Sequence, residues 1–567
     1  MKNTVKFVIV LFAAALMFSC SKKDNETKTG FEKQSGGKII ISSISDPKSF
    51  NPIMAKETST TQAIGWCFEG LTETDGVTTE VRPCLAESWH ISPGGLEWIF
   101  KLRKDVQWFD GKPFTADDVV FTFEKLIYND DIPSSSRDIF TIDGKEIKAE
   151  KIDDFTVKFI LPKPFAPFLR QLGQEIMPKH VLEKAVLEKK FTSTWGVNAN
   201  PSEIVGTGPF YLKEYIPSQK IVLEKNPYYW RKNKDGKQLP YLEQLVILIV
   251  PDQDAELLKF QSGEIDILSP RGQDFALLKA KEKEENFTLF NCGPTFGTNF
   301  LVFNQNLGTV KRPKIDWFTN VEFRRAVAHL IDKNSIINNV MSGLAFPQHS
   351  AMEKAAVFFF NDNVKKYDYD IAKAKEILSH AGFRDKNNDG FIEDKNGNMV
   401  EFTILTNSEN KEREQMGNII ADDLRKAGIN AHFAPIQFNT LVNKLDNPPF
   451  DWDAIIIGLT GGVEPHGGMN VWMSSGQLHM WYPRQEKPAT SWEKEIDDLF
   501  TRGASELNEE KRKGIYFRWQ EVAAEQLPLI YTVNPAAIYA VRNKFGNIHP
   551  TAYGHALHNI WEIYINK

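Results

Sequence analysis

The stretch "AIIIGLTGGVEPHGG" (residues 454–468) joins a short apolar run to a loop that contains five glycines. The unbroken apolar run from Ala454 to Ile457 predicts a buried strand, since strands covered on both faces lack the usual alternation. The glycines allow the backbone after that strand to approach another molecule closely. The stretch holds no obvious nucleophile, so it is a catalytic loop, a phosphate cradle, a ligand clamp or only a turn.

The bulk composition is that of an ordinary globular protein with room for several domains. The chain has 567 residues, of which 42% are hydrophobic and 25% charged, and its formal net charge is -6. A domain of typical size takes roughly 100 to 200 residues. No basic excess of the kind that binds a phosphate backbone is present, so we expect no nucleic-acid partner.

The first 20 residues are predicted to be a targeting signal rather than part of the fold. Lys2 and Lys6 precede an apolar stretch over 7–18, which is too short to span a bilayer comfortably. Ser19 then precedes Cys20, and this arrangement resembles a bacterial lipoprotein signal in which Cys20 becomes the lipidated N-terminus. A plain secretory leader with an accidental cysteine is the alternative. Residues 21–37 are polar and predict a flexible tether.

The remaining cysteines do not indicate a metal site. They are Cys67, Cys84 and Cys292, and no C-x-x-C pair occurs. Outside the cytoplasm a disulfide is allowed, and Cys67 with Cys84 is one candidate pair. Their pairing is left open.

Strand and helix signals alternate along the whole chain after residue 37. Lys38 to Ser43 predicts a first strand, Gln62 to Leu71 a helix ended by Gly70, and Thr115 the N-cap of a helix running to about Ile127. The same patterns predict strands over 157–161, 220–225, 242–250 and 298–304, a helix over 370–382, and another that begins at Ser408 or Asn410 and stops at Gly428. The expected fold class is α/β with mixed sheets in two lobes.

Signals of enzyme chemistry are weak. Residues 385–392 are similar to an EF-hand loop, but its twelfth position is Asn396 instead of the bidentate glutamate that calcium needs. A polar β-turn is preferred there over weak calcium binding. No H-E-x-x-H, G-x-S-x-G or P-loop signature occurs, and the 11 histidines form no metal-spaced cluster. We therefore predict no catalytic residues, no cofactor and no metal.

A series of short motifs, in order along the chain, is more specific than any of these signals. They are Asp46-Pro47…Phe50-Asn51-Pro52, Phe68-Glu69-Gly70-Leu71, Leu85-Ala86-Glu87-Ser88-Trp89, Phe109-Asp110-Gly111-Lys112-Pro113-Phe114-Thr115-Ala116-Asp117-Asp118, Gly206-Thr207-Gly208-Pro209-Phe210, Gly263-Glu264-Ile265-Asp266 and Phe323-Arg324-Arg325-Ala326-Val327. From about Lys38 to the C-terminus the chain closely resembles the dipeptide/oligopeptide-binding family of extracellular solute-binding proteins.

This resemblance implies a periplasmic-binding-protein fold, with two lobes joined by a two-strand hinge that close on a ligand. It implies lobe I over 38–71, 205–285 and 531–567, a subdomain inserted into lobe I over 72–204, and lobe II over 286–530. The implied partners are a peptide or similar solute, the permease and ATPase of an ABC importer, and a membrane reached through the lipid on Cys20. The expected location is the cell envelope, and the expected state is a monomer.

The resemblance also implies the ligand-facing residues. In peptide-binding members the ligand lies extended between two strips of backbone, one per lobe, which by motif position are Glu57-Thr58-Ser59 and Gly458-Leu459-Thr460. Members that bind peptides usually carry an aspartate shortly after the second strip, for the α-ammonium of the peptide. Here Gly461 and Gly462 stand at that place, and Glu464 is one substitute. We predict that Gly462 and Glu464 also face the ligand.

Three aromatic residues downstream, Trp472, His479 and Trp481, are expected on the cleft wall, with a core position as the alternative for each. The missing aspartate leaves open an amine-free ligand such as an oligosaccharide. A ligand sensor with the same fold is a further alternative, and so is a hydrolase with Glu464 and His466 as its acid/base pair.

Overall fold

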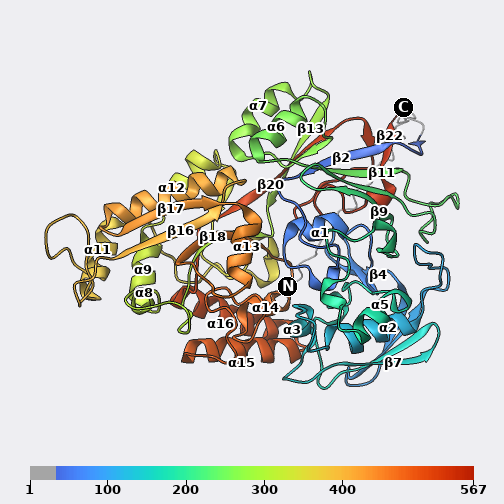
Figure 1. Ribbon diagram of the computed structural model, residues 1–567, viewed down its shortest axis with the longest axis horizontal. Helices are drawn as coiled ribbons and strands as arrows, with labels where there is room; N and C mark the ends of the chain where they lie inside the picture. Colours follow the sequence, from blue (N-terminus) through green and yellow to red (C-terminus); the bar gives the residue numbers. More distant parts are fainter. Residues whose placement is uncertain (1–32, 567) are drawn as a thin grey trace, which may run out of the picture.

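The apolar run after residue 453 is the central strand of a five-stranded sheet (Figure 1). The computed structural model describes residues 33–566. The sheet has the order β17 (Asn430–Ile436), β16 (Glu401–Asn407), β18 (Ala454–Thr460), β14 (Gly297–Phe303), β19 (Leu529–Tyr531). Strand β16 runs parallel to β17 and β18, whereas β14 is antiparallel to β18 and β19. The predicted buried strand is therefore confirmed.

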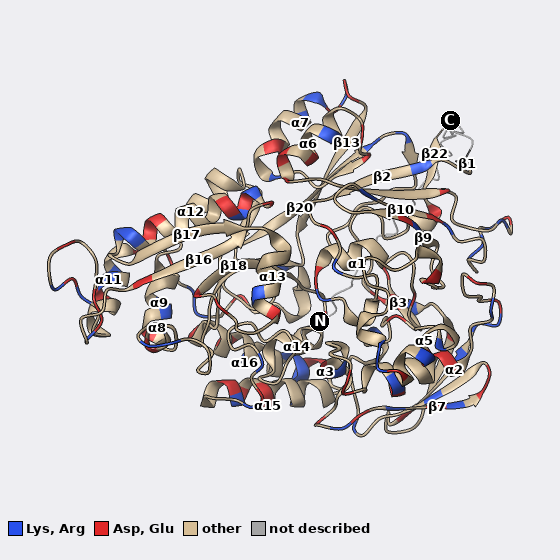
Figure 2. Cartoon of the chain, viewed as in Figure 1, with Lys and Arg blue, Asp and Glu red and all other residues tan. Residues whose placement is uncertain are grey.

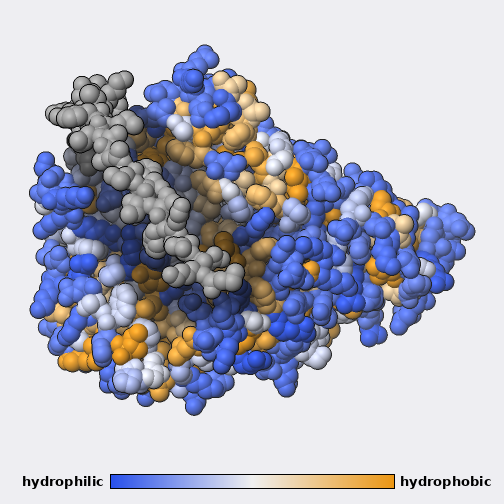
Figure 3. All heavy atoms as spheres, turned by 180° about the vertical axis from the view of Figure 1, so that it is seen from behind, coloured by the Kyte–Doolittle hydropathy of each residue, from blue (hydrophilic) through white to orange (hydrophobic). Residues whose placement is uncertain are grey.

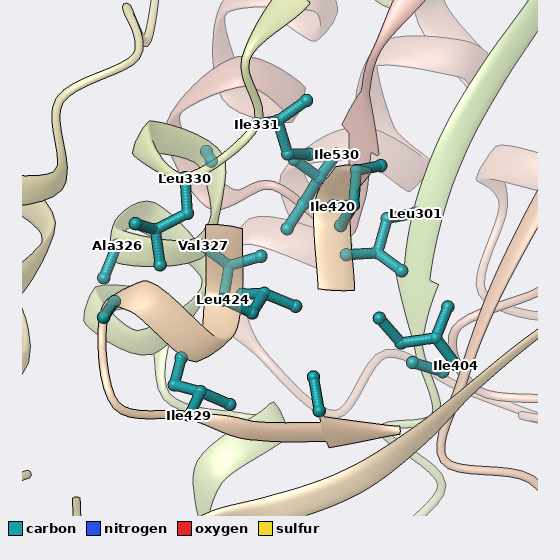
Figure 4. Packing of buried hydrophobic residues seen from close by; sticks show 14 of the residues in the cluster. Leu301, Ala326, Val327, Leu330, Ile331, Ile404, Ile420, Leu424, Ile429 and Ile530 are labelled. Carbon is teal, nitrogen blue, oxygen red and sulfur yellow. The ribbon is translucent and has the colours of Figure 1, made fainter. Parts of the chain in front are cut away.

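Both faces of this sheet are covered, which explains the unbroken apolar runs of its central strands. Leu301 and Phe303 pack into one hydrophobic core, and Phe300 and Val302, which point the opposite way, pack into another. The first core is closed by helices α9 (Val321–His329), α11 (Ile371–His380) and α12 (Lys411–Lys426), as Figure 4 shows for part of it. The second is closed by α13 (Phe438–Asp446), α14 (Met469–Trp472), α15 (Ser491–Ser505) and α16 (Glu509–Gln526).

The other half of the molecule contains two four-stranded sheets. One has the order β2 (Lys38–Ser43), β11 (Gln244–Ile249), β10 (Lys220–Lys225), β9 (Phe210–Ile216), with β2 parallel to β11. The other is antiparallel, with the order β5 (Ala86–Ile91), β6 (Glu97–Leu102), β8 (Thr156–Ile160), β7 (Lys148–Asp153). Its own core includes Phe100, Phe123 and Phe159.

Two antiparallel chain segments connect these halves. Strand β13 (Phe287–Pro294) leads directly into β14, and β19 leads directly into β20 (Val533–Arg542). Strands β13 and β20 pair with each other, and Figure 1 shows β20 running through the middle of the molecule. Together with the separate cores, this arrangement confirms the expected two lobes and two-strand hinge.

The remaining elements are short and cover the sheet edges and faces. The other strands are β1 (Lys33–Gln34), β3 (Thr72–Thr74), β4 (Val81–Pro83), β12 (Ile267–Leu268), β15 (Ala345–Pro347), β21 (Phe545–Gly546) and β22 (Tyr564–Asn566). The other α-helices are α1 (Thr58–Ile64), α2 (Ala116–Phe121), α3 (Ser136–Phe140), α4 (Phe168–Gln171), α5 (Lys179–Leu187), α6 (Gln253–Gln261), α7 (Phe275–Lys281), α8 (Lys314–Phe318) and α10 (Lys333–Ser335). Short helices of other types span Pro52–Met54, Thr122–Ile127, Phe191–Ser193, Pro201–Glu203, Gly272–Asp274, Ile336–Val340, Lys354–Phe359, Pro465–Gly468 and Ile560–Glu562.

The helix predicted over residues 62–71 is wrong in its bounds. Helix α1 begins earlier, at Thr58, and ends at Ile64. Gly70 does not end a helix: a Cβ atom there would lie 2.6 Å from the carbonyl oxygens of Leu172 and Gly173. The glycine is required by a close approach between two backbone segments. The helix predicted from Thr115 is confirmed, with a capping box formed by Thr115 and Asp118.

The N-terminal predictions fall mostly outside the described residues. The predicted signal over 1–20, with Cys20, and the predicted tether up to residue 32 lie outside the described residues. The end of the predicted tether includes β1, which pairs with β22. Cys67, Cys84 and Cys292 are free thiols, so the candidate disulfide between Cys67 and Cys84 is not formed. Within residues 33–566, no helix has both the length and the apolar composition required to cross a bilayer.

Candidate functional site

A cavity of about 1450 Å³ lies between the two halves of the molecule. Its wall draws on α1 from one half and on β18 with its following loop from the other. Figure 3 shows a surface of mixed polar and apolar residues around a hollow on the face turned away in Figure 1. The predicted site residues on the wall are Glu57, Thr58, Ser59, Gly458, Leu459, Thr460, Gly462, Glu464, Trp472 and His479.

One edge of strand β18 is open where the strand reaches the cavity. On its other edge, Gly458 pairs with Asn299, Leu459 with Thr298 and Thr460 with Gly297. Strand β16 pairs with β18 only near its start, at Ala454 and Ile455. In the described chain no further strand lies beside residues 458–460 on that edge. Unpaired N–H and C=O groups of an edge strand are a template for another extended chain.

The first predicted strip, Glu57-Thr58-Ser59, lies at the start of helix α1. Glu57 is extended, with φ −113° and ψ 152°, but it is the N-cap of α1, so Thr58 and Ser59 are helical. All three residues border the cavity, and their contact with a ligand stays a prediction. The hydroxyl of Thr60 donates a short hydrogen bond to the carboxylate of Glu57, which fixes that side chain within the first turn. This wall presents a helix N-terminus to the cavity.

The carboxylate of Glu464 is already paired. It accepts two hydrogen bonds from the guanidinium of Arg512 on α16, one of them at 2.8 Å, and the two side chains are only 10% and 7% exposed. Glu464 also caps the short helix at Pro465 by accepting the backbone N–H of His466 at 3.1 Å. Its charge is committed to the fold, which argues against its substituting for the missing aspartate.

His466 does not form an acid/base pair with Glu464. Its ring is buried and its Nε2 lies 2.9 Å from the carbonyl oxygen of Ile139, on helix α3 of the other half. Burial lowers the pKa of His466 to about 4, so the ring is neutral at physiological pH. The side chain connects the two halves instead of facing a substrate.

The three aromatic predictions have different outcomes. Trp481 is 1% exposed, does not border the cavity, and its Nε1 donates to Glu493 at 3.2 Å, so it belongs to the core. The expectation that it faces the ligand is wrong. Trp472 and His479 border the cavity, although both are buried. Trp472 packs edge-on against Trp519 at a ring distance of 5.0 Å.

Two charged residues of the cavity wall have no sequence signal. Glu353 is buried, and burial raises the pKa of its carboxylate to about 8. Arg413 lies in the first turn of α12 and donates through Nε to Asn299 at 2.9 Å and through Nη1 to Asn407 at 3.1 Å. Burial lowers its pKa to about 10. Neither residue stands in a recognisable motif. Both residues reach the cavity because their segments fold against β18 and the loop that follows it: Arg413 lies beside Gly458, and Glu353 lies beside Gly461.

The acidic loop with EF-hand-like spacing lies apart from the cavity. Oxygens of Asp385, Asp389 and Glu393 come within 4.8 Å of one another. Asp385 accepts the backbone N–H groups of Asn388 and Gly390 at 2.7 and 3.0 Å, as in a polar turn. The hydrogen bonds within the loop account for its acidic residues. Elsewhere acidic and basic residues are interspersed along the chain (Figure 2).

The sequence and the fold match known proteins over most of the chain. The family model "Bacterial extracellular solute-binding proteins, family 5 Middle" matches residues 80–479. A protein from Deinococcus radiodurans described as a probable ABC transporter-binding protein is 31% identical, covering 88% of this chain and 86% of its own. The oligopeptide-binding protein AppA from Bacillus subtilis is 28% identical, covering 86% of each chain.

Solved structures give the same assignment. AppA from Bacillus subtilis in complex with a nonapeptide superposes with a TM-score of 0.82 at 26% identity, covering 94% of this chain and 100% of that one. The fold is also that of MelB from Agrobacterium fabrum C58 in complex with stachyose, with a TM-score of 0.81 at 20% identity and coverage of 94% and 85%. The chain belongs to family 5 of the bacterial extracellular solute-binding proteins.

Proposed function

We propose that this protein captures a peptide between its two lobes and delivers it to the permease and ATPase of an ABC importer. The open edge of β18 over Gly458–Thr460 is the observation that carries this proposal. A peptide lying along that edge adds one strand to the sheet through main-chain hydrogen bonds. Because these bonds do not depend on side chains, the site accepts varied sequences.

The size of the cavity favours an extended ligand. Its volume of about 1450 Å³ exceeds the roughly 300 to 1000 Å³ of typical small-molecule sites. The peptide-binding relative AppA, with a nonapeptide bound, supports the same choice. A saccharide is the alternative, since MelB binds stachyose. Against it stands the packing of Trp472, whose ring is enclosed by Trp481 and Trp519 and offers little face for a sugar.

The two halves already touch around the cavity, as expected for a lobe-closure mechanism. Lys48 donates to Asn443 at 3.1 Å, and the backbone N–H of Gln477 donates to Asp138 at 2.8 Å. Contacts between the ligand and both lobes that form only in the closed state let a bound ligand shift the equilibrium toward closure. No bond of the ligand is broken in this mechanism.

The proposal includes a monomer that is attached to a membrane through a lipid on Cys20. It also includes the lobe and subdomain bounds that the family resemblance implies. A ligand sensor with the same lobes is the competing role. If this protein is a transport component, cells that lack it and cells that lack the permease encoded beside it should each lose uptake of the same peptides. Loss of a transcriptional response with uptake intact would favour the sensor.

A direct binding experiment tests the ligand class. The protein is titrated with random peptide mixtures of fixed length and with a panel of oligosaccharides, and binding is followed by calorimetry and tryptophan fluorescence. We expect binding of peptides and loss of that binding when alternate backbone nitrogens of the peptide are methylated. Binding of oligosaccharides alone would overturn the peptide proposal.

A further inference from the structure

The loop after β18 leaves a space that a glutamate from another segment fills. A Cβ atom at Gly461 would lie 2.6 Å from each carboxylate oxygen of Glu353 and 2.8 Å from the carboxyl carbon. Any side chain at position 461 would displace this carboxylate. Glu353 comes from the segment between β15 and the short helix Lys354–Phe359, more than a hundred residues earlier in the chain.

The carboxylate of Glu353 borders the cavity and has no counter-charge. Glu353 is only 4% exposed, yet it is part of the cavity wall. Among residues 33–566, no cation contributes to the pKa of this carboxylate, and the hydrogen bond that lowers this pKa comes from its own backbone N–H. The nearby charged or titratable group is the phenol of Tyr531, itself buried on β19. A buried carboxylate without a cation is costly, whereas one that receives a cation on ligand binding is not.

We propose that Glu353 is the anionic subsite that binds the ammonium group of the ligand, in place of an acid at position 461. This inference rests on the proposed peptide function and narrows it to ligands with a free amine. Glu464, the acid nearer in the chain, is neutralised by Arg512. Glu353 is the acid whose carboxylate lies against Gly461, directly after the β18 edge. At Gly462, by contrast, a Cβ atom would meet nothing within 4 Å, so that position is merely open.

The position of the subsite fits a peptide on the β18 edge. Gly461 follows Thr460 directly, and its backbone N–H donates to the carbonyl of Phe296. A peptide bonded to residues 458–460 therefore places one of its ends within reach of the Glu353 carboxylate. Main-chain hydrogen bonds hold peptides of different lengths. The Glu353 carboxylate binds the amino end of the peptide and so sets the register of the peptide along β18.

A competition experiment tests this subsite. The protein is incubated with equal amounts of a random tetrapeptide mixture and its N-acetylated counterpart, and bound peptides are quantified by mass spectrometry after denaturation. We expect the wild type to prefer free amines by about 100-fold, and Glu353→Gln to remove that preference. Glu256→Gln is the matched control, because the half-buried Glu256 also borders the cavity but already accepts the hydroxyl of Ser42 at 2.7 Å. That control should keep the preference.

A swap of the acid between the two positions gives an independent test. The double variant Glu353→Ala/Gly461→Asp moves the carboxylate to the loop, into the space that the shortened side chain vacates. Gly461 does not have a positive φ, so its backbone accepts another residue. We expect the double variant to regain at least part of the preference that Glu353→Ala alone loses.

The outcomes separate this inference from the proposed function. Equal binding of free and acetylated peptides by the wild type would overturn the Glu353 subsite and leave peptide binding intact. Capture of neither mixture, together with binding of oligosaccharides, would overturn both. If Glu353→Gln fails to fold, a wild-type ratio near one still overturns the subsite, and the comparison of Glu353→Ala with the double variant assigns the preference to this position.

Discussion

Arg512 on helix α16 holds the glycine-rich loop of the cavity through Glu464. The guanidinium also donates from Nε to the carbonyl of Gly503 at 2.8 Å, so it joins the loop to α15 and α16 at once. We expect Arg512→Ala to lower the free energy of unfolding by about 3 to 5 kcal/mol, because it leaves the carboxylate of Glu464 buried and unpaired. Urea denaturation followed by circular dichroism measures this loss.

Arg518 on the same helix provides the control. Its pairs with Glu495 and Glu521 are about 40% exposed, so Arg518→Ala should cost less than about 1 kcal/mol. Equal losses for the two arginine variants would contradict a structural role for the Glu464–Arg512 pair.

The affinity for amine-bearing peptides should rise with pH. Burial raises the pKa of Glu353 to about 8, so in the free protein this carboxyl is mostly protonated at pH 6. Binding an ammonium requires the ionised form, so the association constant should rise by up to about tenfold per pH unit between pH 6 and 7.5. Calorimetry at several pH values measures this slope, and calorimetry in buffers of different ionisation enthalpy detects the released proton. Glu353→Gln should show a flat profile.

The same raised pKa predicts how the ligand-free protein responds to pH. Between about 4.5, the ordinary pKa, and about 8, the folded state binds more protons at Glu353 than the unfolded state does. The contribution of Glu353 to stability is therefore fully present below pH 4.5 and is lost as pH rises toward 8. The free energy of unfolding of the wild type and of Glu353→Gln, measured at pH 5.5 and 7.5, isolates the contribution of Glu353. A pH-independent difference between the two would count against the buried acid.

Closure of the lobes should depend on Asp138, which does not border the cavity. Its carboxylate accepts the backbone N–H of Gln477 from the other half of the molecule. Asp138→Ala removes this acceptor and should weaken peptide binding by about tenfold. It should also increase the share of open molecules in small-angle scattering of the peptide-saturated protein. Asp138→Asn keeps an acceptor oxygen and should bind nearly as the wild type does; equal defects in both variants would point to a different role.

The sequence predicts the fold better than the site, for physical reasons. Apolar runs such as Ala454 to Ile457 predict buried strands because periodicity reflects burial directly. The sequence predicts Trp481 at the ligand, but an indole bordered by apolar residues fits a core equally well, and only the packing decides between the two. The contact between Glu353 and Gly461 cannot be predicted in this way, because two segments so distant in the chain leave no local sequence pattern when they meet. The sequence does not indicate the helical start at Thr58, because its N-cap, Glu57, is not among the usual capping residues.

The motif Gly206-Thr207-Gly208-Pro209 should be required for packing. A Cβ atom at Gly206 would collide with the carbonyl oxygen of Cys67, and one at Gly208 with that of Trp66. Gly206→Ala must therefore separate two backbone segments, and we expect a loss of about 3 kcal/mol or more in the free energy of unfolding.

Gly514 is the matched control, because it is exposed within helix α16 and a Cβ there meets nothing within 4 Å. Gly514→Ala should instead stabilise the protein by about 0.5 to 1 kcal/mol, since alanine loses less backbone entropy in a helix. Thermal and urea denaturation of both variants measure these opposite signs, and a Gly206→Ala protein as stable as wild type would show that the backbone there separates without cost.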